Sequence, residues 1–162
     1  MERLKLPTSV IGEVDVARLL RELNGLNDFF VGAQARTNGT AMQMPKLSRQ
    51  LDQLAKDNSV NLLDNADRNK LLAGMQGIKS HSPKVQISFA ADPSPKALEQ
   101  ILVWMRRHIH PHLLVQVGLQ PSVAAGCILR TPNKVFDMSL RSNLKKQEPY
   151  LAKLITGAVN ER

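Results

Sequence analysis

Three histidines alternate over a short segment in the second half of the chain, at His108, His110 and His112. Imidazole nitrogens are common zinc ligands, so this segment is the strongest candidate for a metal site. However, Pro111 separates the last two, and no cysteine or acidic pair stands nearby at ligand spacing. We therefore expect exposed histidines at a helix-to-strand junction, with metal binding as the less favoured alternative, and no resident metal or cofactor.

Groups for other kinds of catalysis are sparse. Of the carboxylates after residue 83, only Asp92 and Asp137 adjoin turns, and no pair suited to acid–base catalysis is visible. No serine lies in a nucleophile-elbow pattern, and none of the nine glycines opens a phosphate-binding loop. The sequence therefore predicts a non-catalytic protein without a small-molecule substrate.

The charge of the chain is unevenly distributed. The formal net charge is +8, of which residues 1–82, with 11 basic and 9 acidic residues, contribute +2. Residues 83–162 hold 11 basic and 5 acidic residues, a net charge of +6, so this half suits an acidic partner. Aromatic residues are only 4% of the chain and leave little material for stacking bases, so nucleic acid is the less favoured partner.

Nothing in the sequence indicates a disulfide framework or insertion into a membrane. Cys127 is the single cysteine, which excludes an internal disulfide and fits a reducing compartment. No window approaches about 18 consecutive apolar residues, and the first residues lack an apolar stretch of signal-peptide length. We expect a soluble, cytoplasmic protein whose association with a membrane runs through its partners.

The first half, residues 1–82, is predicted to be helical. Apolar residues recur at helical spacing over 16–30 and again over 46–58. A third run of this kind follows Asp64, whose side chain can cap the first turn of a helix. The pattern therefore predicts about three helices in this region.

The second half, residues 83–162, has a different pattern. Apolar and polar residues alternate over 84–90, which is typical of a half-buried strand. A helical stripe follows over 96–109, and then three further short strands and a last helix. The chain is therefore predicted to have an α+β fold, with a helical region at 1–82 and a small β-α-β-β-β-α domain at 83–162.

The segment GCILRTPNKVFDMSLRSNL, residues 126–144, predicts a strand, a turn, a second strand and the start of the last helix. Gly126 permits close approach of backbones within the sheet. Asp137 stands where its carboxylate can cap the first helical turn, and Arg141 follows at ion-pair spacing. Pro149 is expected to kink or split the last helix.

This segment resembles the C-terminal signature of the delta (OSCP) subunit of F-type ATP synthases. The resemblance covers about residues 84–156, although Met138 stands where the family has a glycine, and the family's helical bundle is longer than the one predicted here. A peripheral-stalk component of V-type ATPases and the stator protein of the flagellar export ATPase have a similar terminal unit. The positions that we take as structural or interaction residues are Gly126, Arg130, Asp137, Ser139, Arg141 and Leu144.

The resemblance implies a non-catalytic peripheral-stalk (stator) subunit that links the stalk to the catalytic head and supports proton-driven ATP synthesis. Its partners would be the stalk helices and the catalytic head, at the inner face of the cell membrane. The alternatives are a stator or regulator of a V-type or secretion-associated ATPase, and a basic nucleic-acid-binding adaptor.

Overall fold

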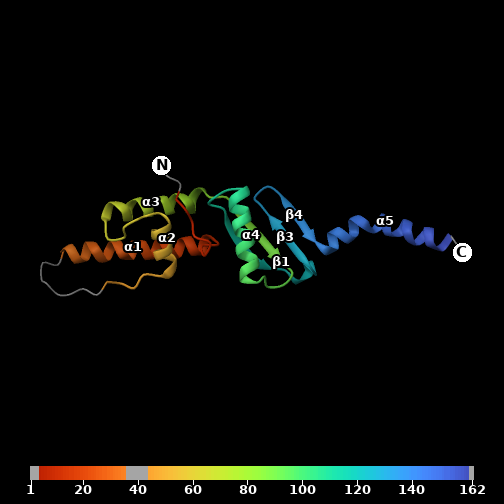
Figure 1. The fold of residues 1–162 in the computed structure, drawn as a ribbon, viewed down its shortest axis with the longest axis horizontal. Helices are drawn as coiled ribbons and strands as arrows, with labels where there is room; N and C mark the ends of the chain where they lie inside the picture. The colour runs from red at the N-terminus through yellow and green to blue at the C-terminus, as the bar shows by residue number, and fades with distance from the viewer. Residues whose placement is uncertain (1–3, 36–43, 161–162) are drawn as a thin grey trace. The chain divides into compact units, whose positions relative to one another are not determined.

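The computed structural model describes residues 4–35 and 44–160, which form an α+β fold, as the sequence predicts (Figure 1). Its elements, in chain order, are α1 (Glu13–Ala35), α2 (Arg49–Asp57), α3 (Asn65–His81), β1 (Lys84–Phe89), α4 (Pro95–His108), β2 (Leu114–Leu119), the short 3-10 helix η1 (Pro121–Val123), β3 (Gly126–Arg130), β4 (Val135–Ser139) and α5 (Leu140–Asn160).

The chain divides into two compact units. The helical unit comprises Met1–Pro83 and Leu98–Val115, and the sheet unit comprises Lys84–Ala97 and Gln116–Arg162. The first division falls one residue from the predicted boundary between residues 82 and 83. The segment 98–115 differs from the prediction, because most of α4 and the first residues of β2 belong with the N-terminal helices.

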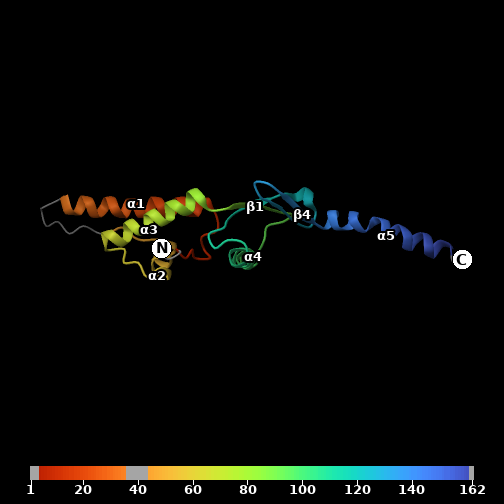
Figure 2. The same ribbon diagram turned by 90° about the horizontal axis from the view of Figure 1, so that it is seen from above.

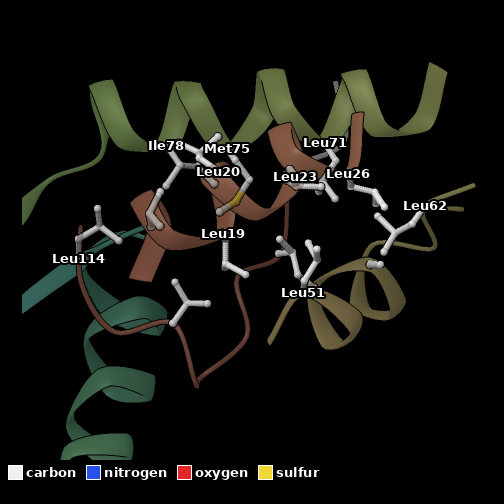
Figure 3. Close-up of a cluster of buried hydrophobic side chains, with 14 residues drawn as sticks. Leu19, Leu20, Leu23, Leu26, Leu51, Leu62, Leu71, Met75, Ile78 and Leu114 are labelled. Atoms are coloured by element: carbon white, nitrogen blue, oxygen red, sulfur yellow. The ribbon is translucent and has the colours of Figure 1, made fainter. Parts of the chain in front are cut away.

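The core of the helical unit is built from the apolar stripes of α1, α2 and α3 (Figure 3). Leu19, Leu23 and Leu51 are at most 1% exposed, and Met75 of α3 is fully buried. Fully burying a leucine or methionine contributes about 1.5–3 kcal/mol, so this shared core is the main source of stability for the three helices. The helical periodicity of the sequence thus identified the residues that pack here.

Capping side chains fix where the helices of this unit begin. The hydroxyl of Ser48 accepts a hydrogen bond from the N–H of Leu51 at 3.2 Å, while the carboxylate of Glu22 in α1 accepts from Ser48. Asp64 accepts from the N–H of Ala66 at the start of α3, as the sequence predicts. These contacts satisfy N–H groups that a helix cannot pair internally.

Arg68 is a charged residue inside this core, at 3% exposure. Its guanidinium donates to the carbonyl oxygens of Leu62 and Leu63, both at 2.9 Å, and to the side chain of Asn27 at 2.6 Å. It also lies 4.2 Å from the centre of the Phe30 ring. The buried charge is therefore solvated by carbonyls, an amide and a π face, which makes Arg68 a structural residue.

A second arginine fastens the segment 4–12, which precedes α1, to α4. Arg106 donates to the carbonyl oxygens of Pro7, at 3.0 Å, and Val10, and to that of Leu113 at 3.3 Å. Burial lowers the pKa of Arg106 to about 10, so the guanidinium remains protonated at neutral pH. This anchoring explains why the α4 segment belongs to the helical unit.

The sheet unit contains a four-stranded mixed sheet in the order β2-β1-β3-β4. β1 and β3 are antiparallel, with Ile87 opposite Leu129 and Phe89 opposite Cys127. β3 and β4 form the predicted hairpin, in which Leu129 lies opposite Phe136. Since side chains alternate along a strand, these apolar residues share one face of the sheet.

The last helix differs from the prediction. α5 is one continuous helix through Pro149, so of the two predicted outcomes, a kink or a split, the split does not occur. A proline inside a helix removes one backbone hydrogen bond and crowds the carbonyl of the preceding turn, which weakens the helix at that point without requiring that it end. From Leu140 to Tyr150 every residue except the half-buried Ser142 is exposed, so this part of α5 covers no face of the sheet, and the ribbon leads away from β4 (Figures 1 and 2).

No helix within residues 4–35 and 44–160 combines the length and the apolar character needed to cross a membrane.

Candidate functional site

The hairpin of β3 and β4 and the start of α5 contain all six predicted interaction residues, and Gly126 allows the two strands to approach closely. Gly126 has a φ of +91° and lies opposite Ser139 in the ladder. A Cβ atom at this position would lie 2.5 Å from the carbonyl oxygen of Met138. Both the backbone conformation and the close approach therefore require glycine here, which gives a physical reason for the glycine of the predicted signature.

Ser139, rather than Asp137, is the residue that caps α5. The hydroxyl of Ser139 accepts a hydrogen bond from the N–H of Ser142 at 3.1 Å. Asp137 lies two residues too early for this role, because β4 continues to Ser139. Its carboxylate instead accepts from the N–H of Ser139 at 2.9 Å and so holds the cap residue in place. The prediction that Asp137 caps α5 was therefore wrong, and Ser139 is the cap.

The electrostatic state of Asp137 follows from this arrangement. The hydroxyl and the backbone N–H of Ser139 both stabilise the carboxylate and lower the pKa of Asp137 below its ordinary value. The positive charges of Lys146 and Arg141 act in the same direction as smaller contributions. Asp137 is therefore ionised at neutral pH, as its role as a hydrogen-bond acceptor requires.

The predicted ion pair between Asp137 and Arg141 does not form. Ion pairs within 4.0 Å join Asp15 to Arg18, Asp52 to Lys56 and Asp67 to Lys70, whereas Asp137 and Arg141 do not form one. Arg141 is exposed near the start of α5. Because Asp137 is in an extended strand rather than in the helix, the four-residue spacing does not bring the two side chains together on one face.

Arg130 lies at the other end of the hairpin, opposite Val135 and away from Gly126. It is half-buried, and its guanidinium donates to the hydroxyl of Ser88 at 3.3 Å and to the side-chain oxygen of Gln120 at 3.4 Å. Arg130 therefore connects β3 to β1 and to the loop after β2. This places it in the scaffold and separates it from the other predicted residues.

The C-terminal arm, defined here as β4 and α5, exposes several large apolar side chains. Phe136 and Met138 of β4 are 45% and 50% exposed, and Leu140 and Leu144 of α5 are each 52% exposed. Isolated exposed apolar residues are ordinary, but a succession along one element marks an interaction surface. Of these residues, only Leu144 was among the predicted interaction residues.

Basic residues surround these apolar side chains. Lys134 precedes β4, and Arg141, Lys145 and Lys146 occupy the first turns of α5, where they are exposed. Asp137 and Glu148 are the acidic residues between Lys134 and Tyr150. The arm thus combines apolar contact area with net positive charge. Phe136 and Met138 were missed because the sequence pattern suggested that the strand ends at Phe136.

The three histidines lie at the predicted helix-to-strand junction, between α4 and β2, but only one of them is exposed. His108 is exposed, and its Nδ1 lies 2.8 Å from the carbonyl oxygen of Trp104. His110 and His112 are half-buried, and Nε2 of His112 lies 2.6 Å from the carbonyl oxygen of Leu4. Across the part of the chain that the structure describes, no group of three or more His, Cys, Asp or Glu side chains is placed to hold a metal ion.

Comparison with protein-family models gives no matching family, and comparison with curated proteins gives no matching relative.

Proposed function

We propose that this protein is a non-catalytic stator subunit of a rotary F-type ATP synthase, in which the C-terminal arm binds the peripheral stalk. The observation that carries the proposal is the exposed arm itself. An isolated helix in water is marginally stable, and α5 buries little of its described surface within the chain. A helix of this kind gains stability when a partner helix covers its apolar side chains.

Charge selects the kind of partner. Arg141, Lys145 and Lys146 favour an acidic surface, and charge complementarity supports both the rate of association and the choice of partner. Acidic amphipathic stalk helices have both properties that the arm needs. The resemblance of residues 126–144 to the delta-subunit signature points to the same partner class.

The hydrogen-bonded joint between β4 and α5 suits a mechanical role. Gly126 lies opposite Ser139 in the ladder, and the hydrogen bonds of Asp137 and Ser139 hold the start of α5. In the proposed role these contacts would set the direction in which α5 leaves the sheet. A subunit that resists torque has to transmit force through such a joint without bending. In this role the protein would work in the cytoplasm, held at the inner face of the cell membrane by the complex, while the other unit would be available to the catalytic head.

The test is recovery of ATP synthase stalk subunits with the tagged full-length chain, using Leu144→Asp as the disrupting variant. Val14→Asp is the matched control, because Val14 is a 79% exposed apolar residue on α1, outside the arm. We expect Leu144→Asp to weaken assembly by about tenfold or more, and Val14→Asp to leave it unchanged.

Melting curves of both variants show whether the chain still folds. Equal recovery of stalk subunits with both variants, or no recovery with the unmodified chain, would refute the proposal. Strong binding to arbitrary nucleic acid that falls steeply with salt would instead favour the adaptor alternative.

A further inference from the structure

Arg130 is held more loosely than the two arginines that fasten the helical unit. Arg68 donates to two backbone carbonyl oxygens at 2.9 Å, and Arg106 donates to another at 3.0 Å. Arg130 instead makes hydrogen bonds of 3.3 and 3.4 Å to the neutral side chains of Ser88 and Gln120. A guanidinium has five N–H donors, so the remaining donors of Arg130 have no partner among the residues that the structure describes.

The side chains around Arg130 form one polar face of the sheet. Opposite residues of an antiparallel pair point to the same side, and Gln86 lies opposite Arg130 while Ser88 lies opposite Ile128. β2 contributes Gly118 to this side, since a Cβ atom added there would lie 3.7 Å from Oγ of Ser88 and 3.9 Å from Nε2 of Gln86. Three neighbouring strands therefore share this polar face.

The polar face is open to solvent, whereas the opposite face of β1 is buried. Gln86 and Gln116 are exposed, but Ile87, which points to the other side, is 2% exposed. Gly118 follows Gln116 at the next position on the polar face and contributes no side chain. It therefore leaves room for a small ligand beside Gln86 and Arg130.

The charge of this face favours an anion. Lys84 lies on it two residues before Gln86, and adds a positive charge to that of Arg130. Asp137 points to the same side, because β4 also pairs with β3, but it is two strand spacings, or about 10 Å, from β1. Its carboxylate accepts a hydrogen bond from the N–H of Ser139 at 2.9 Å, while Arg130 extends the other way, toward β1. A ligand over β1 and β2 is thus nearer to the positive charges than to the carboxylate.

We propose that the polar face around Arg130 binds an oxyanion, a carboxylate or a phosphate group, with the side-chain amide of Gln86 as a further donor. The planar fork of an arginine binds both groups through two parallel hydrogen bonds, which are shorter and stronger than bonds to neutral acceptors. The inference does not rest on the stator role, since it uses β1, β2 and β3 and not the C-terminal arm.

The test titrates the isotopically labelled full chain with inorganic phosphate or with acetate, followed by NMR. Sodium chloride at the same ionic strength is the control for screening. We expect the Nε–Hε signal of Arg130 and the side-chain amide signals of Gln86 to shift saturably, with a Kd on the order of 1–10 mM. Tighter binding of phosphate would assign a phosphate group as the ligand, and tighter binding of acetate would assign a carboxylate.

Variants separate the role of the guanidinium from a general effect of charge. Arg130→Gln should weaken the binding of both anions by about tenfold or more, and Arg130→Lys, which keeps the charge without the fork, should weaken it less. Arg107→Gln is the matched control, because Arg107 is an exposed arginine on α4, and it should leave binding unchanged.

Gly118→Val keeps Arg130 and places a side chain in the space beside Gln86. It should weaken anion binding severalfold, so the proposal can be tested even if Arg130→Gln fails to fold. Melting curves of each variant show whether the fold is kept.

Two outcomes would overturn the proposal. The first is a lack of saturable shifts at Arg130 with both anions, or shifts that sodium chloride reproduces. The second is binding by folded Arg130→Gln or by folded Gly118→Val that equals binding by the unmodified chain. Loss of stalk binding by Leu144→Asp would leave these titrations unaffected, so the two proposals fail separately.

Discussion

Leucines at helical spacing are buried in α1, near the start of the chain, and exposed in α5, near its end. Leu19 and Leu23 of α1 are at most 1% exposed, whereas Leu140 and Leu144 of α5 are each 52% exposed. α1 packs its stripe against α2 and α3, but the described residues provide no comparable cover for the start of α5. A helical stripe therefore indicates that a helix needs a partner, while only the fold shows whether the chain contains that partner.

The largest expected effect tests this contrast directly. Leu19→Ala should destabilise the helical unit by about 2–5 kcal/mol, because it leaves a cavity in a closed core. Leu144→Ala should change stability by no more than about 0.5 kcal/mol, because the side chain is exposed in the isolated chain. Urea unfolding followed by the helical signal measures both. Equal losses would mean that α5 packs within its own chain and that the contrast is false.

An intermediate effect compares two glycines. Gly126→Ala should destabilise the sheet unit by roughly 1–3 kcal/mol, since it forces a positive φ on alanine and a clash with Met138. Gly25 lies in the middle of α1, and a Cβ atom added there would meet nothing within 4 Å, so Gly25→Ala should stabilise by about 0.5–1 kcal/mol. Thermal unfolding of both variants gives the signs. Destabilisation by both would point to helix packing around Gly25.

The smallest expected effect concerns how the stability of the fold depends on pH through Asp137, just before α5. The native pKa of Asp137 lies below its ordinary value of 3.8, so the carboxylate stabilises the fold above that value. This contribution is lost as the pH falls through the lower native pKa. Asp137→Asn keeps an acceptor for Ser139 but has no charge. The variant should therefore not show the loss of stability at low pH that protonation of Asp137 causes.

Melting temperatures between roughly pH 2 and pH 6 measure this difference, in the range where carboxylates titrate. Ser139→Ala is the matched control, since it removes the hydroxyl donor and keeps the N–H. It should reduce the pH dependence without abolishing it. An identical pH profile for the unmodified chain and Asp137→Asn would show that the joint does not depend on the charge.

The sequence alone predicted the type and order of the helices and strands. Helical spacing and strand alternation are local properties that follow from backbone geometry, so they predicted three helices, the change of pattern after residue 83 and the final hairpin. The close approach of backbones at Gly126 was also predicted, from the position of this glycine in the strand. The sequence did not predict the cap of α5 correctly. The cap residue is the last residue of the paired part of β4, and pairing with β3 determines where that end lies.

Tertiary structure alone decided which long-range contacts the polar residues make. The carbonyl acceptors of Arg106 include Pro7 and Val10, which lie 99 and 96 residues earlier in the chain. No periodicity relates such positions, because a guanidinium binds any carbonyl that the fold presents at the right distance. The same holds for the exposure of Leu144: its spacing places it on one apolar face of α5, but burial depends on whether another surface is folded against that face.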